Sequence, residues 1–227
     1  LNNTSYLALT THYLLQNADL LIINSSVLTC TEFSEKHTAD NISTWLLDTA
    51  KDWGISNKIS AIVTDNAANM VAAVRLCNWR HIGCFAHSFN LIVQKGLMHI
   101  EHIVSKVKAV VQHFKQSAYA TAKLVETQKQ MSLPQLKLKQ DVVTRWNSTF
   151  DMLNRFLENK DCLVSTLAVL GLDSNKFSFS NSDWITIKYS VAVLEIFSNV
   201  TKDISDEKSV TISKIPILVR IVALKLN

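Results

Sequence analysis

The order of apolar and polar positions divides the chain into a part with short apolar runs and a part with helical periodicity. Residues 5–14 and 20–29 are rich in Leu, Ile and Val and are separated by a short polar segment, which predicts an antiparallel hairpin. Residues 38–53 then combine a helix-starting segment with apolar side chains at helical spacing, and Gly54 ends this helix. Two strands followed by a helix indicate an α/β architecture.

Two further strands are predicted before residue 88. The apolar residues 59–64 are typical of a strand buried in the centre of a sheet, and a short helix is predicted after them over residues 70–76. Residues 82–86 form the next short apolar run. We therefore expect one mixed sheet of four strands, with Asp65 at the carboxyl end of a central strand. Open α/β sheets usually hold their chemistry at that position.

From residue 88 onward the periodicity is helical. Apolar side chains from Ile100 to Phe114 recur along one helix face with lysines between them, which is typical of a helix side that faces a core. A polar stretch over residues 129–141 contains a proline and predicts a loop, and further helices are expected after it. The sequence has no run of about eighteen apolar residues, so it predicts no transmembrane span and no membrane partner.

Composition and charge favour a folded intracellular protein with a basic middle segment. The chain is 48% hydrophobic and 19% charged, which argues against disorder. Its four cysteines are scattered without the spacing of a disulfide framework, which indicates reduced thiols. Residues 88–160 contain eleven Lys and Arg against five Asp and Glu, whereas residues 1–87 contain five against seven. The basic segment suggests a polyanion as partner, and solvated lysines on exposed helix faces are the alternative.

A cluster of metal-ligand side chains lies before the helical part: Cys77, His81, Cys84 and His87. Zinc ligands usually come as pairs on two separate knuckles, and this single stretch lacks that spacing. A strand over residues 82–86 would also turn Cys84 and His87 to opposite faces. Cys84 and His87 lack the oxyanion turn and the orienting carboxylate that nucleophilic catalysis needs.

Asp65 and the pair Arg145–Trp146 are the other candidates for chemistry. A carboxylate at a strand end can bind a hard divalent cation, or it can accept backbone N–H groups as the cap of the following helix. Arg145 can contact phosphate and Trp146 can stack on an unpaired base. Both are also ordinary residues at a helix start or in a core, and these alternatives stay open.

Five short motifs follow one another at intervals that match a known family. They are Tyr6–Tyr13, His37–Ile42, Val63–Met70, Cys84–Leu91 and Thr144–Thr149. Together they resemble the hAT superfamily of DNA transposases, and in particular the BED zinc-finger proteins domesticated from these transposases. The resemblance implies an RNase H-like core that is interrupted by a large helical insertion. It also implies three acidic residues that bind two divalent metals and drive phosphodiester hydrolysis and strand transfer.

The resemblance assigns roles to individual residues. Asp65 matches the second acidic residue of the family, on the central strand of the core. Cys84 and His87 match a C-x-x-H motif beside the active site. Arg145 and Trp146 match an R-W motif in the insertion, whose Trp is similar to one that stacks near the transposon end.

The resemblance also predicts how the chain is organised. It implies a partial RNase H-like core over residues 1–95, whose first strand and first acidic residue precede Tyr6, and a helical insertion over residues 96–227. The third acidic residue, a Glu, has no match, since neither Glu195 nor Glu207 lies in a corresponding setting. One carboxylate cannot organise two metal ions. We therefore expect no catalysis and no bound cofactor as the chain stands, with Mg²⁺ or Mn²⁺ only in an active parent.

The sequence thus predicts a fragment of a nuclear, DNA-binding, transcription-regulatory BED-type protein without catalytic activity. Lys106 and Lys108, in the basic segment, are expected to contact DNA together with Arg145 and Trp146. One alternative is an active hAT transposase whose other acidic residues lie outside this chain, and another is a helical protein-interaction module. The family's BED finger and dimerisation segment are not in this sequence, so a homo-oligomer would form through a segment outside it.

Overall fold

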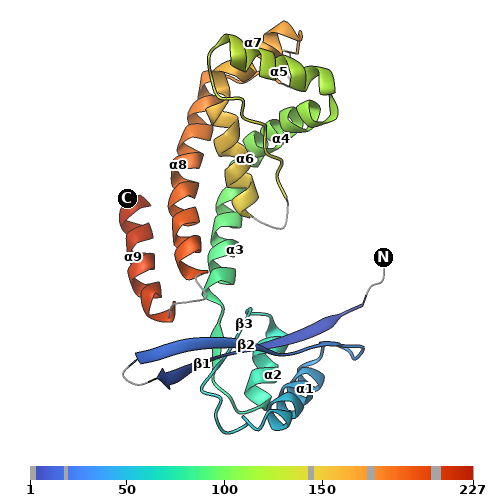
Figure 1. Ribbon diagram of the computed structural model, residues 1–227, viewed down its shortest axis with the longest axis vertical. Coiled ribbons are helices and arrows are strands. Elements are labelled where there is room, and N and C mark those ends of the chain that lie inside the picture. The colour runs from blue at the N-terminus through green and yellow to red at the C-terminus, as the bar shows by residue number, and fades with distance from the viewer. Residues whose placement is uncertain (1–3, 18–19, 143–145, 173–176, 206–210, 227) are drawn as a thin grey trace. The chain divides into compact units, whose positions relative to one another are not determined.

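The computed structural model describes residues 4–17, 20–142, 146–172, 177–205 and 211–226 (Figure 1). The first elements are β1 (Tyr6–Asn17), β2 (Leu20–Glu32), α1 (Ala39–Asp52), β3 (Ile62–Thr64), α2 (Ala68–Leu76) and β4 (His81–Gly83). The helices that follow are α3 (Phe85–Met98), α4 (Glu101–Gln116), α5 (Ala118–Gln130), α6 (Trp146–Glu158), α7 (Lys160–Val169), α8 (Asn181–Ile204), the 3-10 helix η1 (Ile212–Lys214) and α9 (Ile215–Leu226). Contacts divide the chain into two compact units, which are Leu1–Phe89 with Ile204–Pro216 and Asn90–Asp203 with Ile217–Asn227.

The first unit begins with the predicted antiparallel hairpin. Strands β1 and β2 pair along their whole length, with a register shift between Leu9 and Thr10. Before the shift, Leu7 and Leu9 pack against the core of this unit. Beyond the shift several apolar side chains are exposed, and Leu20 and Leu21 are 70% and 66% exposed. Among the described residues of β1, Leu7 and Leu9, both before the shift, are the ones that pack against this core.

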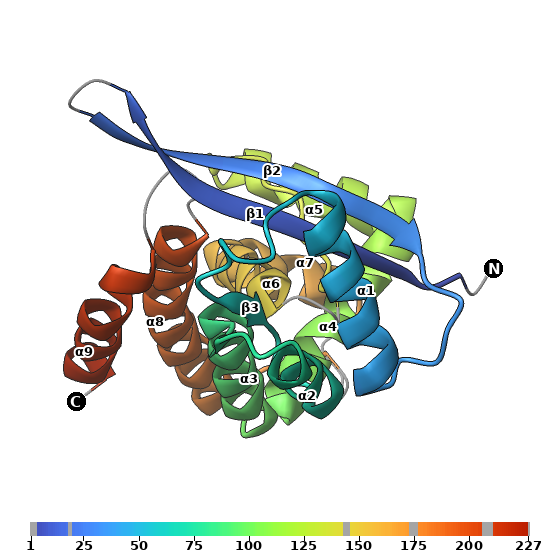
Figure 2. The same ribbon diagram turned by 90° about the horizontal axis from the view of Figure 1, so that it is seen from below.

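Helix α1 has the start and the end that the sequence predicts. The Thr38 hydroxyl accepts a hydrogen bond from the Asn41 backbone N–H at 3.3 Å, which caps the helix. Gly54 has a φ of +64°, a left-handed conformation that ends helices and suits glycine. Helices α1 and α2 lie on the same side of the hairpin (Figure 2). Their buried side chains and the end of β2 form one apolar cluster, which consists of Phe33, Ile42, Leu46, Ala73, Val74 and Cys77.

The sheet differs from the single mixed sheet that the sequence predicted. Strands β3 and β4 pair in parallel over three residues each, with helix α2 between them in the chain. Within the described residues this pair is a two-stranded sheet of its own, and β1 and β2 form another. Residues 59–61 lie outside β3 and residues 85–86 already belong to α3, so both predicted strands are too long. The mixed α/β order is confirmed, whereas an RNase H-like sheet stays a prediction.

The regular secondary structure of the second unit is helical within the described residues. The apolar stripe predicted on α4 is buried, from Ile103 to Phe114. Helices α5 and α7 pack side by side (Figure 1). In the described part of the chain, no helix has both the length and the apolar character that crossing a bilayer requires. The assignment of residues 1–95 to a core and 96–227 to an insertion stays a prediction, because packing within a chain does not show family organisation.

The predicted loop after α5 is fixed at several points. Gln128 of α5 is buried, and its side-chain amide donates to the Leu136 carbonyl oxygen at 3.0 Å. Arg155 of α6 donates to the Lys137 carbonyl oxygen at 3.0 Å. The side chain of Leu138 is buried. This loop therefore packs onto the helices although it has no regular secondary structure.

Candidate functional site

Asp65 lies immediately after β3, as predicted, and its side chain is exposed. The prediction that this strand is central and buried is wrong within the described residues, because β3 belongs to a two-stranded sheet and Val63 is 60% exposed. The Ala67 backbone N–H donates to Asp65 Oδ1 at 3.2 Å. The N-cap position of α2 is Ala67 and not Asp65, so the carboxylate closes the turn before the helix and does not occupy the cap itself. The interpretation of Asp65 as the cap of α2 is therefore wrong, whereas binding of a divalent cation at Asp65 stays a prediction.

The side chains beside Asp65 in the chain form hydrogen bonds to the neighbouring strand and helix. Thr64 Oγ1 lies 2.9 Å from His81 Nε2 on the neighbouring strand. The Asn66 side-chain amide donates to Ser88 Oγ at 3.1 Å. Among the residues that the structure describes, no three or more His, Cys, Asp and Glu side chains come together in a way that could hold a metal ion. A two-metal centre needs converging carboxylates, and the binding of a divalent metal at Asp65 stays a prediction.

Asn66 connects the ends of β3 and β4 to helix α3. A Cβ atom added to Gly83 would lie 2.4 Å from Asn66 Oδ1, so the amide packs directly over the glycine backbone. The same amide reaches Ser88 in the first turns of α3. Sequence reasoning missed Asn66 and Ser88, although an Asn directly after a strand-end Asp is a signal that could have found them.

The positions of Cys84 and His87 correct one argument made from the sequence. Strand β4 ends at Gly83 and α3 begins at Phe85, so the strand predicted over residues 82–86 is too long. The Cys84 carbonyl oxygen accepts the Ser88 N–H at 3.2 Å, as in a first helical turn. Cys84 and His87 are therefore three residues apart along a helix start, which places them on one side and not on opposite faces.

Cys84 is close to the end of β3. Its backbone N–H donates to the Thr64 carbonyl oxygen at 2.7 Å, and Thr64 directly precedes Asp65. The zinc alternative does not gain from this placement. Cys77 is buried, its Sγ lies 3.6 Å from the Ser43 carbonyl oxygen, and burial raises the pKa of its thiol. His81 hydrogen-bonds to Thr64, so the side chains of Cys77 and His81 face different partners.

Of the predicted R-W pair, Arg145 lies outside the described residues. Trp146 is the first residue of α6, and its side chain is only 4% exposed. The indole is thus packed in the helical unit, as the alternative interpretation from the sequence proposed. Its stacking on DNA stays a prediction.

The two predicted DNA-binding lysines of α4 each form an ion pair. Lys106 Nζ lies 2.6 Å from Asp183 Oδ2, and the same ammonium lies 4.7 Å from the centre of the Phe179 ring. Lys108 Nζ lies 2.7 Å from Asp141 Oδ2. Both charges are therefore partly neutralised within the protein. Their contact with DNA stays a prediction.

Asp141 was missed by sequence reasoning, because it lies in a polar loop. Its side chain is 3% exposed. Ser148 Oγ and Thr149 Oγ1 lie 2.7 and 2.8 Å from Asp141 Oδ1, while Lys108 binds the other oxygen. Burial acts to raise the pKa of Asp141, but the hydrogen bonds from Lys108, Ser148 and Thr149 outweigh it and hold that pKa below its usual value.

Asp183 is held in a similar way at the start of α8. Burial again acts to raise the pKa of Asp183, but the bonds from Lys106 and Ser180 outweigh this effect and hold the pKa below its usual value. The Ser180 backbone N–H donates to Asp183 Oδ2 at 3.0 Å, and the Asp183 N–H donates to Ser180 Oγ at 3.1 Å. This reciprocal pair is a capping box, which fixes the first turn of α8.

Other lysines of the basic segment are better placed to meet a phosphate. Within the described residues, four of them are exposed and form no ion pair, namely Lys95, Lys115, Lys129 and Lys137. Charge counting along the sequence could not separate these from the paired lysines, because the pairing partners are distant in the chain. Lys106 and Asp183 are 77 residues apart.

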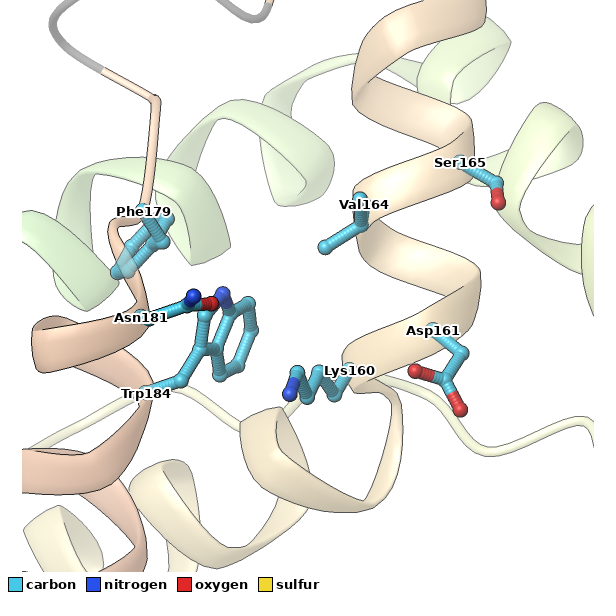
Figure 3. Close-up of a pocket in the computed structure, with 7 residues that line it drawn as sticks. All are labelled: Lys160, Asp161, Val164, Ser165, Phe179, Asn181 and Trp184. Atoms are coloured by element: carbon cyan, nitrogen blue, oxygen red, sulfur yellow. The ribbon is translucent and has the colours of Figure 1, made fainter.

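An open pocket of about 360 Å³ lies between the first turns of α7 and α8. In Figure 3, Lys160 extends toward Trp184, Val164 points between them, and Asp161 points away. The Lys160 ammonium lies 5.3 Å from the centre of the Trp184 indole, and Phe156 stacks on the same indole at 5.4 Å. The indole thus already has an ammonium and an aromatic ring as partners within the helical unit.

The fold and the site define a mixed α/β protein with one acidic residue at a strand end and a helical second part. A family profile described as the ZBED1 RNase-like domain matches residues 1–80. A second profile, described as the ZBED1 RNase-like helical domain, matches residues 82–193. Together the two profiles cover most of the chain, which belongs to the family of BED proteins derived from hAT transposases.

Proteins named as BED zinc-finger proteins and a protein named as a transposase are both similar to this chain. Zinc finger BED domain-containing protein 6 of Homo sapiens is 28% identical over 216 residues, which are 89% of this chain and 22% of that protein. The Putative AC transposase of Zea mays is 28% identical over 178 residues, 71% of this chain and 22% of that protein. Zinc finger BED domain-containing protein 4 of Homo sapiens is 27% identical over 180 residues, 77% of this chain and 14% of that protein. The chain thus spans less than a quarter of the length of these relatives.

Proposed function

We propose that this chain is a non-catalytic, DNA-binding part of a nuclear BED-type transcription regulator. The observation that carries the proposal is the set of exposed, unpaired lysines in the described helical part: Lys95, Lys115, Lys129 and Lys137. Unpaired cations bind the phosphate backbone by releasing its counterions, whereas a lysine already paired with a carboxylate contributes less. Arg145 and Trp146 add the predicted contacts at the start of α6.

Binding of this kind is independent of DNA sequence. Non-specific complexes have a Kd of about 10⁻⁴–10⁻⁶ M at physiological salt, and each neutralised phosphate adds about 0.9 to the slope of log K against log salt. Four phosphates neutralised by lysines would therefore give a slope of about −3.6. The sequence specificity of a BED-type regulator would come from outside this chain.

The proposed lack of catalysis rests on the environment of Asp65. Its described neighbours Thr64, Asn66 and Ser88 are neutral, and a pair of catalytic metal ions needs several carboxylates. We expect millimolar or weaker Mg²⁺ affinity as the chain stands.

An active transposase is the second candidate, because Asp65 is exposed at a strand end and one relative is named a transposase. In that case the other acidic residues would lie outside this chain. An RNase H-like sheet would then require one more strand. Since β1 and β3 each pair on one side only within the described residues, a strand from before Tyr6 has free edges to join.

Fluorescence anisotropy at two salt concentrations tests DNA binding. We expect Lys115→Ala/Lys129→Ala to reduce the salt slope by about 1.8, or about 0.9 for each phosphate that is no longer neutralised. Lys123→Ala/Lys139→Ala is the matched control, because it removes the same charge from lysines that are paired with Glu126 and Asp151. Equal reductions of the salt slope in the two double variants would show that net charge alone determines DNA binding. If the unaltered chain shows no salt-dependent binding, DNA binding is refuted.

A cleavage assay distinguishes the two candidates. We expect no nicking of a labelled hairpin or transposon-end duplex in Mg²⁺ or Mn²⁺. Mn²⁺-dependent cleavage that disappears in Asp65→Ala would refute the non-catalytic proposal and support the transposase.

A further inference from the structure

Asp141 is a nearly buried carboxylate in a loop whose other polar side chains are mostly exposed. It uses both oxygens. Oδ2 binds Lys108 of α4 at 2.7 Å, and Oδ1 faces two hydroxyls of α6. Three separate segments of the helical unit therefore meet at one side chain.

The two hydroxyls belong to the first turns of α6. Ser148 Oγ also accepts the Val142 backbone N–H at 2.8 Å, so the loop backbone is attached to the same turn. Thr149 is buried, as is Trp146 one turn earlier. A negative charge near a helix N-terminus is favourable for the helix dipole, which adds to these bonds. The position of the start of α6 is thus fixed from the loop and, through Lys108, from α4.

We propose that Asp141 is a positioning residue for DNA binding, which holds the start of α6, where Trp146 lies, in place against α4. The inference rests on the proposed DNA binding and names the side chain that orders its contact surface. A different function for Asp141 would be to mask the charge of Lys108. Two of its three side-chain partners are hydroxyls, however, and these carry no charge to mask.

Asp183 provides a matched comparison. It pairs with Lys106, which is two residues from Lys108 on the same helix, and its other described partner, Ser180, precedes α8. Asp183→Asn and Asp141→Asn each remove one negative charge that pairs a lysine of α4. If only charge matters, both variants bind DNA more tightly by a similar factor, because each frees one cation for phosphates.

Positioning predicts effects of opposite sign. We expect Asp183→Asn to raise the affinity for a duplex at fixed salt, and Asp141→Asn to lower it at least threefold although Lys108 is released. The substitution removes the negative charge near the start of α6 and the charge-assisted bonds that both hydroxyls donate to the carboxylate, and an amide NH₂ could only donate to these hydroxyls in their place. Affinity is measured by anisotropy at a temperature where melting curves show each variant to be folded.

A second variant keeps the ion pair and removes only the hydroxyls. Ser148→Ala/Thr149→Val leaves Asp141 and Lys108 paired, and we expect it to lower DNA affinity as Asp141→Asn does while leaving the salt slope unchanged. If Asp141→Asn raises affinity as Asp183→Asn does, or if the hydroxyl variant binds like the unaltered chain, the positioning role is wrong and DNA binding stands. If the unaltered chain shows no salt-dependent binding, the proposed function fails, and the positioning role fails with it.

Discussion

Replacing Trp146 by Ala separates packing from DNA contact at the start of α6. The side chain is 4% exposed, and the buried residues of α6 share its core: Thr149, Met152, Leu153 and Phe156. Truncating a buried Trp or Phe to Ala costs about 3–5 kcal/mol of unfolding free energy, since it removes apolar burial and leaves a cavity. For a chain of this size each kcal/mol lowers Tm by about 2–4 °C, so we expect Tm to fall by about 6–20 °C.

Trp53→Ala is the control, because Trp53 is 54% exposed at the end of α1. A surface substitution of this kind changes stability by about 0.5 kcal/mol or less. Thermal melting followed by circular dichroism compares the two variants directly. If Trp146→Ala melts as Trp53→Ala does, the packing of Trp146 described above is wrong.

The same variant tests the predicted stacking. Stacking on an unpaired base contributes about 1–3 kcal/mol, so Trp146→Ala should weaken binding to a flapped or hairpin DNA more than binding to plain duplex. Lys106→Ala/Lys108→Ala should change binding to both DNAs alike, because phosphate contacts do not distinguish them. A lower Tm with unchanged affinities of the folded protein for both DNAs would refute the stacking role and leave packing as the role of the indole.

Two more predictions concern the described contacts. Gly83→Ala should lower the free energy of unfolding in urea by about 1 kcal/mol, because its Cβ displaces the Asn66 amide from Ser88. Combining it with Asn66→Ala should lower that free energy by less than the sum of the two single changes, and an additive result would contradict the contact. Asp141 and Asp183 have lowered pKa values in the folded protein, so their contribution to stability is present above the ordinary carboxyl pKa of about 3.9 and disappears as pH falls through the lowered values. Melting between neutral pH and about pH 3 should therefore show a steeper acid destabilisation for the unaltered chain than for Asp141→Asn/Asp183→Asn, and equal slopes would show that these carboxylates do not set acid stability.

The features that the sequence predicted correctly are local ones. Thr38 caps α1 and Gly54 ends it, because capping and left-handed conformations depend on single residue types. The stripe on α4 is buried because a regular period of about 3.6 residues places those side chains on one face. The position of Asp65 after a strand followed in the same way from where an apolar run ends.

The features that the sequence did not reveal depend on distant partners. The apolar residues Phe85 and Ala86 fit a strand as well as a helix. In the structure they are helical, because the Ser88 N–H bonds to the Cys84 carbonyl oxygen and forms the first helical turn. Whether four strands join in one sheet is decided by pairing between segments, which an apolar pattern does not specify. In the sequence, Asp141 does not differ from other loop carboxylates. Its role depends on Lys108 and on the start of α6, which contact it only in the folded chain.

Residues 131–142, the described part of the loop between α5 and α6, are irregular, yet their dynamics should be those of the helices. Side chains of Gln128 and Arg155 hold its carbonyl groups at Leu136 and Lys137, and Leu138 is buried. Opening the loop therefore requires breaking bonds to two helices, which places it in the same cooperative unit as α5 and α6. A protease needs an extended chain to cleave, so this stretch, although it lacks secondary structure, should be cut only when the helical unit itself unfolds.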